Sequence, residues 1–562
     1  ARCAGDMSAT VETVTPVIVD AYGRAAELDA YLGDPADPGG RMPLAVTLER
    51  DHDRAFPAEA VAALDAWGLP RRYVPEAFGG GLRDVFELLL LMRTVAARDL
   101  TVAVGHGKTV LGAISAWAAA DDSATHMARI VGAGEAVSWG LTEKDRGSDL
   151  AASQTAAASA GGGIRLDGHK WPIGNATRGR AITVLARTED KPGPRALSLV
   201  LVDKTEVDPA TLSYRARRPL HGIRGADISG IDFGGTVVPG DRRVGAPGQG
   251  IEIVLKSLQV TRTLCAALSL GAGDQALACL AASRVDAAVI ARGAADMLLA
   301  EAVAFAGARL FHVAPAEMAL TSAFVKVLVP DLVDGVIRDG SYALGVNVLL
   351  EDGPGAAWEK VARDAKVVSI FDGNSVVNLN VVINELPNIA RGVDEEAGDV
   401  DAFAFDRDAG AFDMSGLRLV TRRGSRLLRS LPDLVERLDD GRAHPEAVQI
   451  ARALVGVWRE LAVRVHETER AARPPVAQFA LAEQVTSVFA GAAAIAVFVA
   501  NRDHASGDAW NGDLWLRAAL ARVTGRLAID IGTLPAAELQ QLAVGGSISL
   551  LPEWRAQGRG GA

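Results

Sequence analysis

The stretch Arg363-Asp-Ala-Lys-Val-Val-Ser-Ile-Phe-Asp-Gly-Asn-Ser375 decides how the rest of this chain is interpreted. It predicts a helix that ends in a carboxylate, Asp372, directly before Gly373. Glycine commonly ends helices because it adopts the left-handed conformation without strain. We therefore expect the Asp372 carboxylate to lie in a fixed position at a helix end.

The hydrophobic pattern divides the chain into four regions around this stretch. Apolar residues recur at helical spacing from about Pro57 to Ala133, and again from Ile251 to about Arg391. Between them, from about Glu135 to Val244, short β-branched runs alternate with turn residues, which is typical of an antiparallel sandwich or barrel. A polar, acidic linker, Gly392 to Asp408, precedes a last helical region. The order of elements is therefore helical, β, helical and helical.

Composition excludes several classes of function. The 562 residues carry a net charge of −11 and no long basic run, which argues against nucleic acid as a partner. The longest apolar run, Val485 to Ala500, is short for a membrane span, so we expect a buried bundle helix and no integral membrane segment. Residues 1–20 lack the pattern of a secretory signal. Cys3, Cys265 and Cys279 form no metal-ligand spacing, so we expect reduced thiols, no metal and a cytoplasmic location.

Several motifs in a fixed order resemble the acyl-CoA dehydrogenase family. The opening stretch is similar to the family segment that places its catalytic base before a glycine. The other motifs that carry the resemblance are Trp67-Gly-Leu-Pro70, Val74-Pro-Glu-Ala-Phe-Gly-Gly80, Leu141-Thr-Glu-Lys-Asp-Arg-Gly-Ser-Asp149, Gly168-His-Lys-Trp-Pro-Ile-Gly-Asn175, Gly222-Ile-Arg-Gly225 and Gly248-Gln-Gly250. One such motif is weak evidence, whereas this many in order are strong evidence.

The resemblance implies an α+β fold. We expect an N-terminal helical domain at residues 1–134, a central antiparallel β-domain at 135–245 and a helical bundle at 246–391. Residues 409–562 then form an additional C-terminal helical domain. This last region resembles, in position and helicity, the extra domain of the larger family members that form dimers. A homodimer is therefore expected.

The resemblance also implies a chemistry and a set of site residues. In the family, a base takes the α-proton of an acyl thioester while FAD accepts a hydride from the β-carbon. Asp372 would be the base, and Ser148, Arg262 and Gly373 would contact the substrate. The residues expected around FAD are Trp139, Leu141, Thr142, Gly147, Ser148, Ile173, Gly174, Gly345 and Asn374.

Two features of the site depart from the family pattern. Most members carry glutamate where this chain has Asp372, whose side chain is shorter by about 1.5 Å. A misplacement of roughly 1 Å can cost on the order of 100-fold in rate. A few relatives place the base just before the arginine of the substrate channel, but Thr261 occupies that position before Arg262. Only Gly345 remains of the segment that contacts the adenosine end of FAD in the family.

Three hypotheses follow. The first is FAD-dependent α,β-dehydrogenation of an acyl thioester on coenzyme A or a carrier protein, with an electron-transfer flavoprotein or another acceptor as partner. The second keeps the fold and changes the reaction, because nitroalkane oxidases, which are relatives of the family, use aspartate as their base. The third is a non-catalytic paralogue, since some expected FAD contacts are missing.

Overall fold

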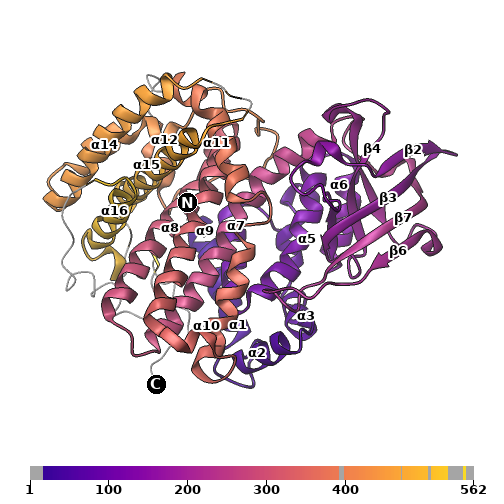
Figure 1. The fold of residues 1–562 in the computed structure, drawn as a ribbon, viewed down its shortest axis with the longest axis horizontal. Helices are drawn as coiled ribbons and strands as arrows, with labels where there is room; N and C mark the ends of the chain where they lie inside the picture. The colour runs from indigo at the N-terminus through magenta and orange to yellow at the C-terminus, as the bar shows by residue number, and fades with distance from the viewer. Residues whose placement is uncertain are drawn as a thin grey trace, which may run out of the picture.

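The computed structural model describes residues 17–391, 398–469, 471, 473–503, 505, 508–529 and 549–551. Cys3 and the outer ends of the first and last predicted domains lie outside these residues. In Figure 1 the sheet lies at one end of the molecule, the helices α14, α15 and α16 lie at the other, and the long helices α7, α8 and α9 lie between them. The predicted order of helical, β, helical and helical regions is confirmed.

The N-terminal region is helical, as its apolar spacing predicts. Its helices are α1 (Val17–Leu32), α2 (Leu44–His52), α3 (Ala58–Trp67), α4 (Val85–Arg98), α5 (Leu100–Ala119) and α6 (Asp122–Gly132). Gly68, at φ 92°, ends α3 in the left-handed conformation. Asp84, Asp99 and Asp121 begin α4, α5 and α6 by accepting a hydrogen bond from a backbone amide of the first turn.

The β region forms one eight-stranded sheet. Its strands are β1 (Val137–Gly140), β2 (Ala156–Ala160), β3 (Gly163–Gly174), β4 (Ala181–Arg187), β5 (Leu197–Asp203), β6 (Leu212–Arg215), β7 (Ile228–Pro239) and β8 (Arg243–Val244). The strand order is β6-β7-β3-β2-β4-β5-β8, and β1 pairs with β4. Most pairs are antiparallel, as predicted, but β1 pairs with β4 in parallel and β2 meets β4 in parallel at one residue pair. The sheet is therefore mixed.

Two helical regions follow the sheet. The bundle consists of α7 (Gly250–Ala281), α8 (Ala287–Val313), α9 (Met318–Leu344), α10 (Ala356–Asp364) and α11 (Ser375–Arg391). The last region consists of α12 (Arg426–Arg429), α13 (Leu431–Leu438), α14 (Pro445–His466), α15 (Val476–Asn501) and α16 (Leu514–Arg526). α8 packs against α9 as well as against α15 and α16, so the two regions share one core.

Two helices, α7 and α15, are long and apolar enough to cross a membrane by length and composition alone. In the folded chain, 72% of the apolar window of α7 and 83% of that of α15 are buried against other parts of the protein. α15 contains the predicted run Val485 to Ala500 and lies inside the C-terminal helices, so it is a core helix.

Thr261 and Arg262 lie inside α7, which begins at Gly250 after Gly245 and Gly248 turn the chain at φ 76° and 77°. One local prediction is wrong. Asp372 does not end a helix, because α10 stops at Asp364 and a short 3-10 turn follows at Ala365–Val367. The carbonyl groups after this turn accept hydrogen bonds from buried side chains of α7 and α9 instead of continuing the helix.

The predicted linker is packed over part of its length. Val400–Phe403 forms a short 3-10 helix, and Val400, Ala402, Phe403 and Phe405 are buried. The Phe405 ring contacts Phe305 of α8 edge to face, with centroids 4.9 Å apart. In the sequence, the acidic residues around these apolar side chains make the segment resemble a polar linker.

A short segment near the C-terminus returns to the bundle core. Ser549 Oγ donates to Glu301 Oε1 of α8 at 2.6 Å, and the Leu550 amide donates to the other carboxylate oxygen at 3.1 Å. Arg93 of α4 lies 3.0 Å from the same Glu301 carboxylate. Glu301 therefore joins the N-terminal helices, the bundle and residues 549–551.

Candidate active site

Asp372 lies in a tight turn between α10 and α11. Its φ of 55° and the φ of 88° at Gly373 are both left-handed, a conformation that aspartate tolerates better than most residues with a side chain. Three contacts fix this turn. Lys326 Nζ donates to the Val368 carbonyl at 2.5 Å, Ser369 Oγ donates to Asp334 at 2.8 Å, and Arg262 Nε donates to the Asp372 carbonyl at 3.1 Å.

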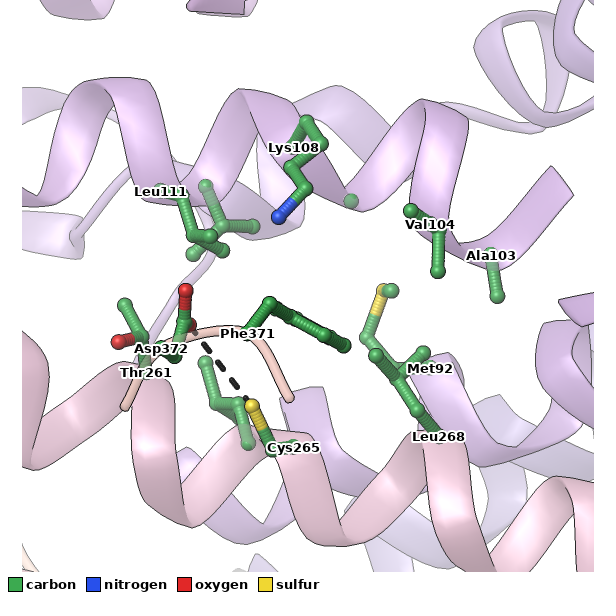
Figure 2. Close-up of a pocket in the computed structure, with 13 residues that line it drawn as sticks. Met92, Ala103, Val104, Lys108, Leu111, Thr261, Cys265, Leu268, Phe371 and Asp372 are labelled. Carbon is green, nitrogen blue, oxygen red and sulfur yellow. Dashed lines mark hydrogen bonds between the residues drawn. The ribbon is translucent and has the colours of Figure 1, made fainter. Parts of the chain in front are cut away.

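An apolar pocket opens in front of the Asp372 carboxylate. Its walls come from α4, α5, α7 and the turn, and its empty space, including the open mouth, is about 390 Å³. The lining side chains include Met92, Ala103, Val104, Val110, Leu111, Leu264, Leu268 and Phe371, together with Lys108, Thr261 and Cys265. Figure 2 shows Asp372 at one end of this pocket, Met92 and Leu268 toward the other, and Phe371 between them.

The groups next to Asp372 are cationic or neutral donors. Cys265 Sγ donates to Asp372 Oδ2 at 3.7 Å, and burial raises the pKa of this thiol to about 12, so it stays neutral near pH 7. Burial lowers the pKa of Arg262 and of Lys326 from their ordinary values, although both groups lie near the Asp372 charge. The Asp372 amide donates to no group in the described part of the chain. It is therefore free to bind a ligand oxygen.

The first two residues of the opening stretch join three parts of the molecule. Arg363 donates to Asp51 of α2 at 2.5 Å and to the His221 carbonyl at 3.1 Å. Asp364 accepts from the Ile223 amide at 2.5 Å and from Lys360 Nζ at 2.6 Å. These residues therefore fix the start of the segment that leads to Asp372.

Several residues expected around FAD lie together at the edge of the sheet. Trp139 lies on β1 and donates from its indole to Ser115 of α5 at 3.1 Å. The Trp171 amide donates to the Thr142 carbonyl at 2.9 Å, which brings Leu141 and Thr142 beside Ile173 and Gly174 of β3. The half-buried Thr142 hydroxyl makes no hydrogen bond to any described residue.

The remaining expected residues lie in three different places. Gly147 and Ser148 are exposed in the loop after β1. Asn374 caps α11, because its Oδ1 accepts from the Val377 amide at 2.9 Å. Gly345, at φ 59°, lies at the exposed end of α9, and no contact in the described structure joins it to the other expected FAD residues.

A buried ion pair organises the loop after β1. Lys170 Nζ of β3 lies 2.8 Å from Glu143 Oε1 and donates to the Leu141 carbonyl at 3.1 Å. Glu143 also accepts from Ser153, Gln154 and Thr155. Burial alone would raise the pKa of Glu143, but Lys170 and these donors hold it well below its usual range. Burial lowers the pKa of Lys170 to about 8.

Sequence reasoning missed Lys108, Lys326 and the contact of Cys265 with Asp372. A signal was present for each lysine, since both interrupt apolar helical runs, at 102–116 and 318–333. Lys326 is 1% exposed and Lys108 is half-buried, and a lysine in an apolar helix face is rare unless it has a partner or a function. Cys265 follows Arg262 by three residues, so both lie on one face of α7.

Comparison with known proteins agrees with this architecture. The model of the acyl-CoA dehydrogenase middle domain matches residues 138–235, and that of the C-terminal domain matches residues 248–386. A probable acyl-CoA dehydrogenase of Mycobacterium leprae is 26% identical over 352 residues, which is 60% of this chain and 89% of the relative. The human mitochondrial short-chain specific acyl-CoA dehydrogenase is 25% identical, over 61% of this chain and 86% of its own length.

Solved structures share the fold. Butyryl-CoA dehydrogenase from Megasphaera elsdenii matches 67% of this chain and 98% of its own, with a TM-score of 0.58 and 22% identity. An acyl-CoA dehydrogenase from Bacillus anthracis, solved in complex with FAD, matches 95% of both chains with a TM-score of 0.65 and 15% identity. The fold of that protein matches this chain over the helices after Arg391 as well. The two domain models and the named relatives together show that this chain belongs to the acyl-CoA dehydrogenase family.

Proposed function

We propose that this protein is an oxidoreductase that uses FAD to dehydrogenate an acyl-CoA between its α- and β-carbons, with Asp372 as the base. The observation that carries this proposal is the Asp372 carboxylate at the end of an apolar pocket between α4, α5 and α7. An acyl chain fits the chemistry of these walls, because burying it releases water from apolar surface. The matching relatives named acyl-CoA dehydrogenases favour coenzyme A over a carrier protein.

The residues at the sheet edge suit a flavin. FAD, when bound, supplies the acceptor for the hydride that leaves the β-carbon. Trp139, Leu141 and Thr142 would contact it from the end of β1, with Ile173 and Gly174 contacting it from β3. The observation that supports this fit is the half-buried Thr142 hydroxyl, which has no protein partner in the described structure and is free to donate. Gly147 and Ser148 would approach the pyrophosphate or the thioester from the exposed loop, and Asn374 would contribute beside Asp372.

The residues of the turn would each have a separate role in binding the thioester and removing its α-proton. The Asp372 carboxylate would accept the α-proton, and its free amide would donate to the thioester carbonyl oxygen as charge develops there. Arg262 would keep this amide and carboxylate in place by binding the Asp372 carbonyl. Gly373, whose position leaves 3.2 Å between a would-be Cβ and the Arg262 guanidinium, would allow the substrate to pass close to the backbone. The neutral Cys265 thiol would orient one carboxylate oxygen.

The proposal includes a homodimer that passes its electrons to an electron-transfer flavoprotein or another acceptor. Large apolar side chains near Gly345 support a subunit contact, since Tyr342, Val346 and Leu349 are 81%, 70% and 76% exposed. Light scattering of the purified protein measures the oligomeric state. A cytoplasmic location stays a prediction from the spacing of the cysteines in the sequence.

The central experiment is anaerobic mixing of the FAD-loaded protein with straight-chain acyl-CoAs. Loss of the flavin absorption band, with a long-wavelength charge-transfer band, is the expected result. Asp372→Asn is expected to retain FAD and to slow this bleaching by about 100- to 10,000-fold, the usual contribution of a general base. Unchanged bleaching in that variant would remove Asp372 from the mechanism.

The oxidase hypothesis is supported by the residue type of the base, because nitroalkane oxidases also use aspartate in this role. Nitroethane in place of the thioester, with rapid reoxidation by oxygen, would favour an oxidase of the nitroalkane-oxidase type. A purified protein that takes up no FAD would instead favour the non-catalytic paralogue.

A further inference from the structure

Lys108 is a half-buried lysine that lines the pocket and makes no ion pair with any residue that the structure describes. It lies on α5, and Figure 2 shows its side chain extending from that helix toward Phe371 and Asp372. Its Nζ lies 4.3 Å from the centroid of the Phe371 ring. No hydrogen bond or ion pair joins this group to any residue that the structure describes. The contact with the Phe371 ring offsets only part of the hydration that the Lys108 ammonium group loses in the pocket.

The stem of Lys108 is fixed in this direction by strand β3. A Cβ at Gly174 would lie 2.8 Å from Cγ, 3.1 Å from Cδ and 3.4 Å from Cε of Lys108. Only the absence of a side chain at residue 174 therefore makes room for the stem. Packed against the strand, the stem directs its ammonium group into the pocket rather than to solvent.

The charges around the pocket are unbalanced. Around the turn, Lys108, Arg262 and Lys326 are three cations, whereas the described contacts place two carboxylates there, Asp372 and Asp334. Arg262 and Lys326 bind backbone carbonyls, and Cys265 is a neutral thiol. The half-buried Lys108 can therefore attract a ligand anion, because it makes no ion pair with any described residue.

A second polar group lacks a partner in the same pocket. Thr261, which lines the pocket from α7, is 1% exposed, and its hydroxyl makes no hydrogen bond to any residue that the structure describes. A buried hydroxyl in this state has free donor capacity for an oxygen atom of a ligand. A purely aliphatic acyl chain would satisfy neither this hydroxyl nor Lys108.

We propose that Lys108 pairs with a carboxylate carried by the acyl chain beyond its β-carbon, so that the preferred substrate is the monothioester of a dicarboxylic acid. This inference rests on the proposed dehydrogenation and specifies its substrate class. The reaction at the α- and β-carbons is unchanged, and the distal carboxylate takes part only in binding. An aliphatic chain of the same length would bury the Lys108 ammonium against apolar atoms and lose affinity.

The test compares matched pairs of coenzyme A thioesters that differ only in the terminal carboxylate. The pairs are butyryl with succinyl, pentanoyl with glutaryl, and hexanoyl with adipyl. Anaerobic bleaching gives kcat/KM for each, and calorimetry on the non-reacting Asp372→Asn holoprotein gives Kd. We expect the best dicarboxylyl thioester to exceed its partner by about 10- to 100-fold, the range of one charged hydrogen bond.

Three variants assign this preference to Lys108. Lys108→Met keeps the stem without the charge and is expected to abolish or reverse the preference, whereas Lys108→Arg keeps most of it. Lys256→Met removes a lysine from the outer face of α7, where it pairs with Glu252 at 2.9 Å, and is expected to change nothing. A preference for the aliphatic thioester in the native protein, or a dicarboxylyl preference that survives Lys108→Met, would overturn the inference.

The two proposals fail in different ways. If no thioester bleaches the flavin, the proposed dehydrogenation is wrong, and the calorimetric comparison still decides whether Lys108 selects carboxylates. If neither member of any pair binds, both proposals are wrong. Equal bleaching and equal Kd values within each pair would keep the dehydrogenation and overturn the inference alone.

Discussion

Asp372 combines a short side chain with an unusual backbone. Its left-handed φ of 55° turns the chain, so the position of the carboxylate is set by the turn and not by a helix. The Asp372 side chain is one methylene shorter than glutamate. This difference alone does not fix how far the carboxylate reaches, because the backbone of the turn sets where the side chain starts. The anchors of this backbone, Arg262 and Lys326, become as important as Asp372.

Arg262→Met tests that anchoring. The variant leaves the Asp372 carbonyl without its donor, and we expect kcat/KM to fall on the order of 100-fold, as a small misplacement of a catalytic group can cause. Thermal unfolding and FAD content serve as controls and are expected to change little. If kcat/KM is within twofold of the native value, the turn is fixed without Arg262.

Cys265 offers a direct check of the pocket environment. Because burial raises the pKa of its thiol to about 12, almost no thiolate is present at pH 8. We expect iodoacetamide to modify the half-buried Cys279 well before Cys265, as measured by peptide mass spectrometry. Both thiols should react alike in denaturant. Rapid labelling of Cys265 in the folded protein would contradict its contact with Asp372.

At the scale of elements, the loop after β1 depends on one buried ion pair. Lys170 of β3 and Glu143 of the loop close the segment that holds Leu141 and Thr142. Glu143 is 4% exposed and Lys170 is fully buried. Removing one partner leaves the other charge buried, which typically costs 3–5 kcal/mol.

Lys170→Met is therefore expected to lower the free energy of unfolding by about 3–5 kcal/mol at pH 7, measured by urea denaturation. The double variant Lys170→Met/Glu143→Gln, which leaves no unpaired charge, should recover much of this loss. A double variant as unstable as the single one would show that packing of the Lys170 stem, and not charge, is responsible.

The same pair predicts a dependence on pH. The folded-state pKa of Glu143 lies below its ordinary value of 4.5, so its stabilising contribution is present above pH 4.5 and is lost as the pH falls below that value. In Lys170→Met the carboxyl group lacks this partner and loses little on protonation. We expect the stability difference between native protein and variant to stay nearly constant from pH 7 to pH 5 and to shrink as the pH falls below 4.5, by urea denaturation at each pH.

The sequence predicted whole elements better than the contacts of the site. Apolar spacing located the helices and the β region. The turn at Asp372 was not predictable, because its carbonyl groups bind Arg262 and Lys326, which lie 110 and 42 residues from their partners. Periodicity reports on neighbours along the chain and carries no information on such distant pairs.

At the scale of the molecule, one charged cluster joins domains that the sequence separates. Lys360 Nζ binds Asp99 of α5 at 2.7 Å and Asp364 of α10 at 2.6 Å, and Asp364 also accepts from the Ile223 amide of the β-domain. Burial alone would lower the pKa of Lys360, but the two carboxylates raise it above its ordinary value. The cluster keeps the β-domain and the bundle in a fixed relation around the pocket.

Asp364→Ala is expected to destabilise the whole protein by about 3–5 kcal/mol, because it removes one of the two carboxylates that pair with the buried Lys360. The matched control is Asp339→Ala, which breaks the exposed pair with Arg338 and should cost less than about 1 kcal/mol. Differential scanning calorimetry measures both. Equal, small effects would show that the cluster is dispensable.

The return of residues 549–551 to the bundle core bears on how this longer form could have evolved. Glu301 is 3% exposed and shares its carboxylate among Arg93, Ser549 and the Leu550 amide. A version shortened to the three domains of the smaller relatives would lose two of these donors and uncover the faces of α8 and α9 that pack against α15. The additional helices are thus not a detachable module, and loss of that region would require compensating substitutions in the bundle.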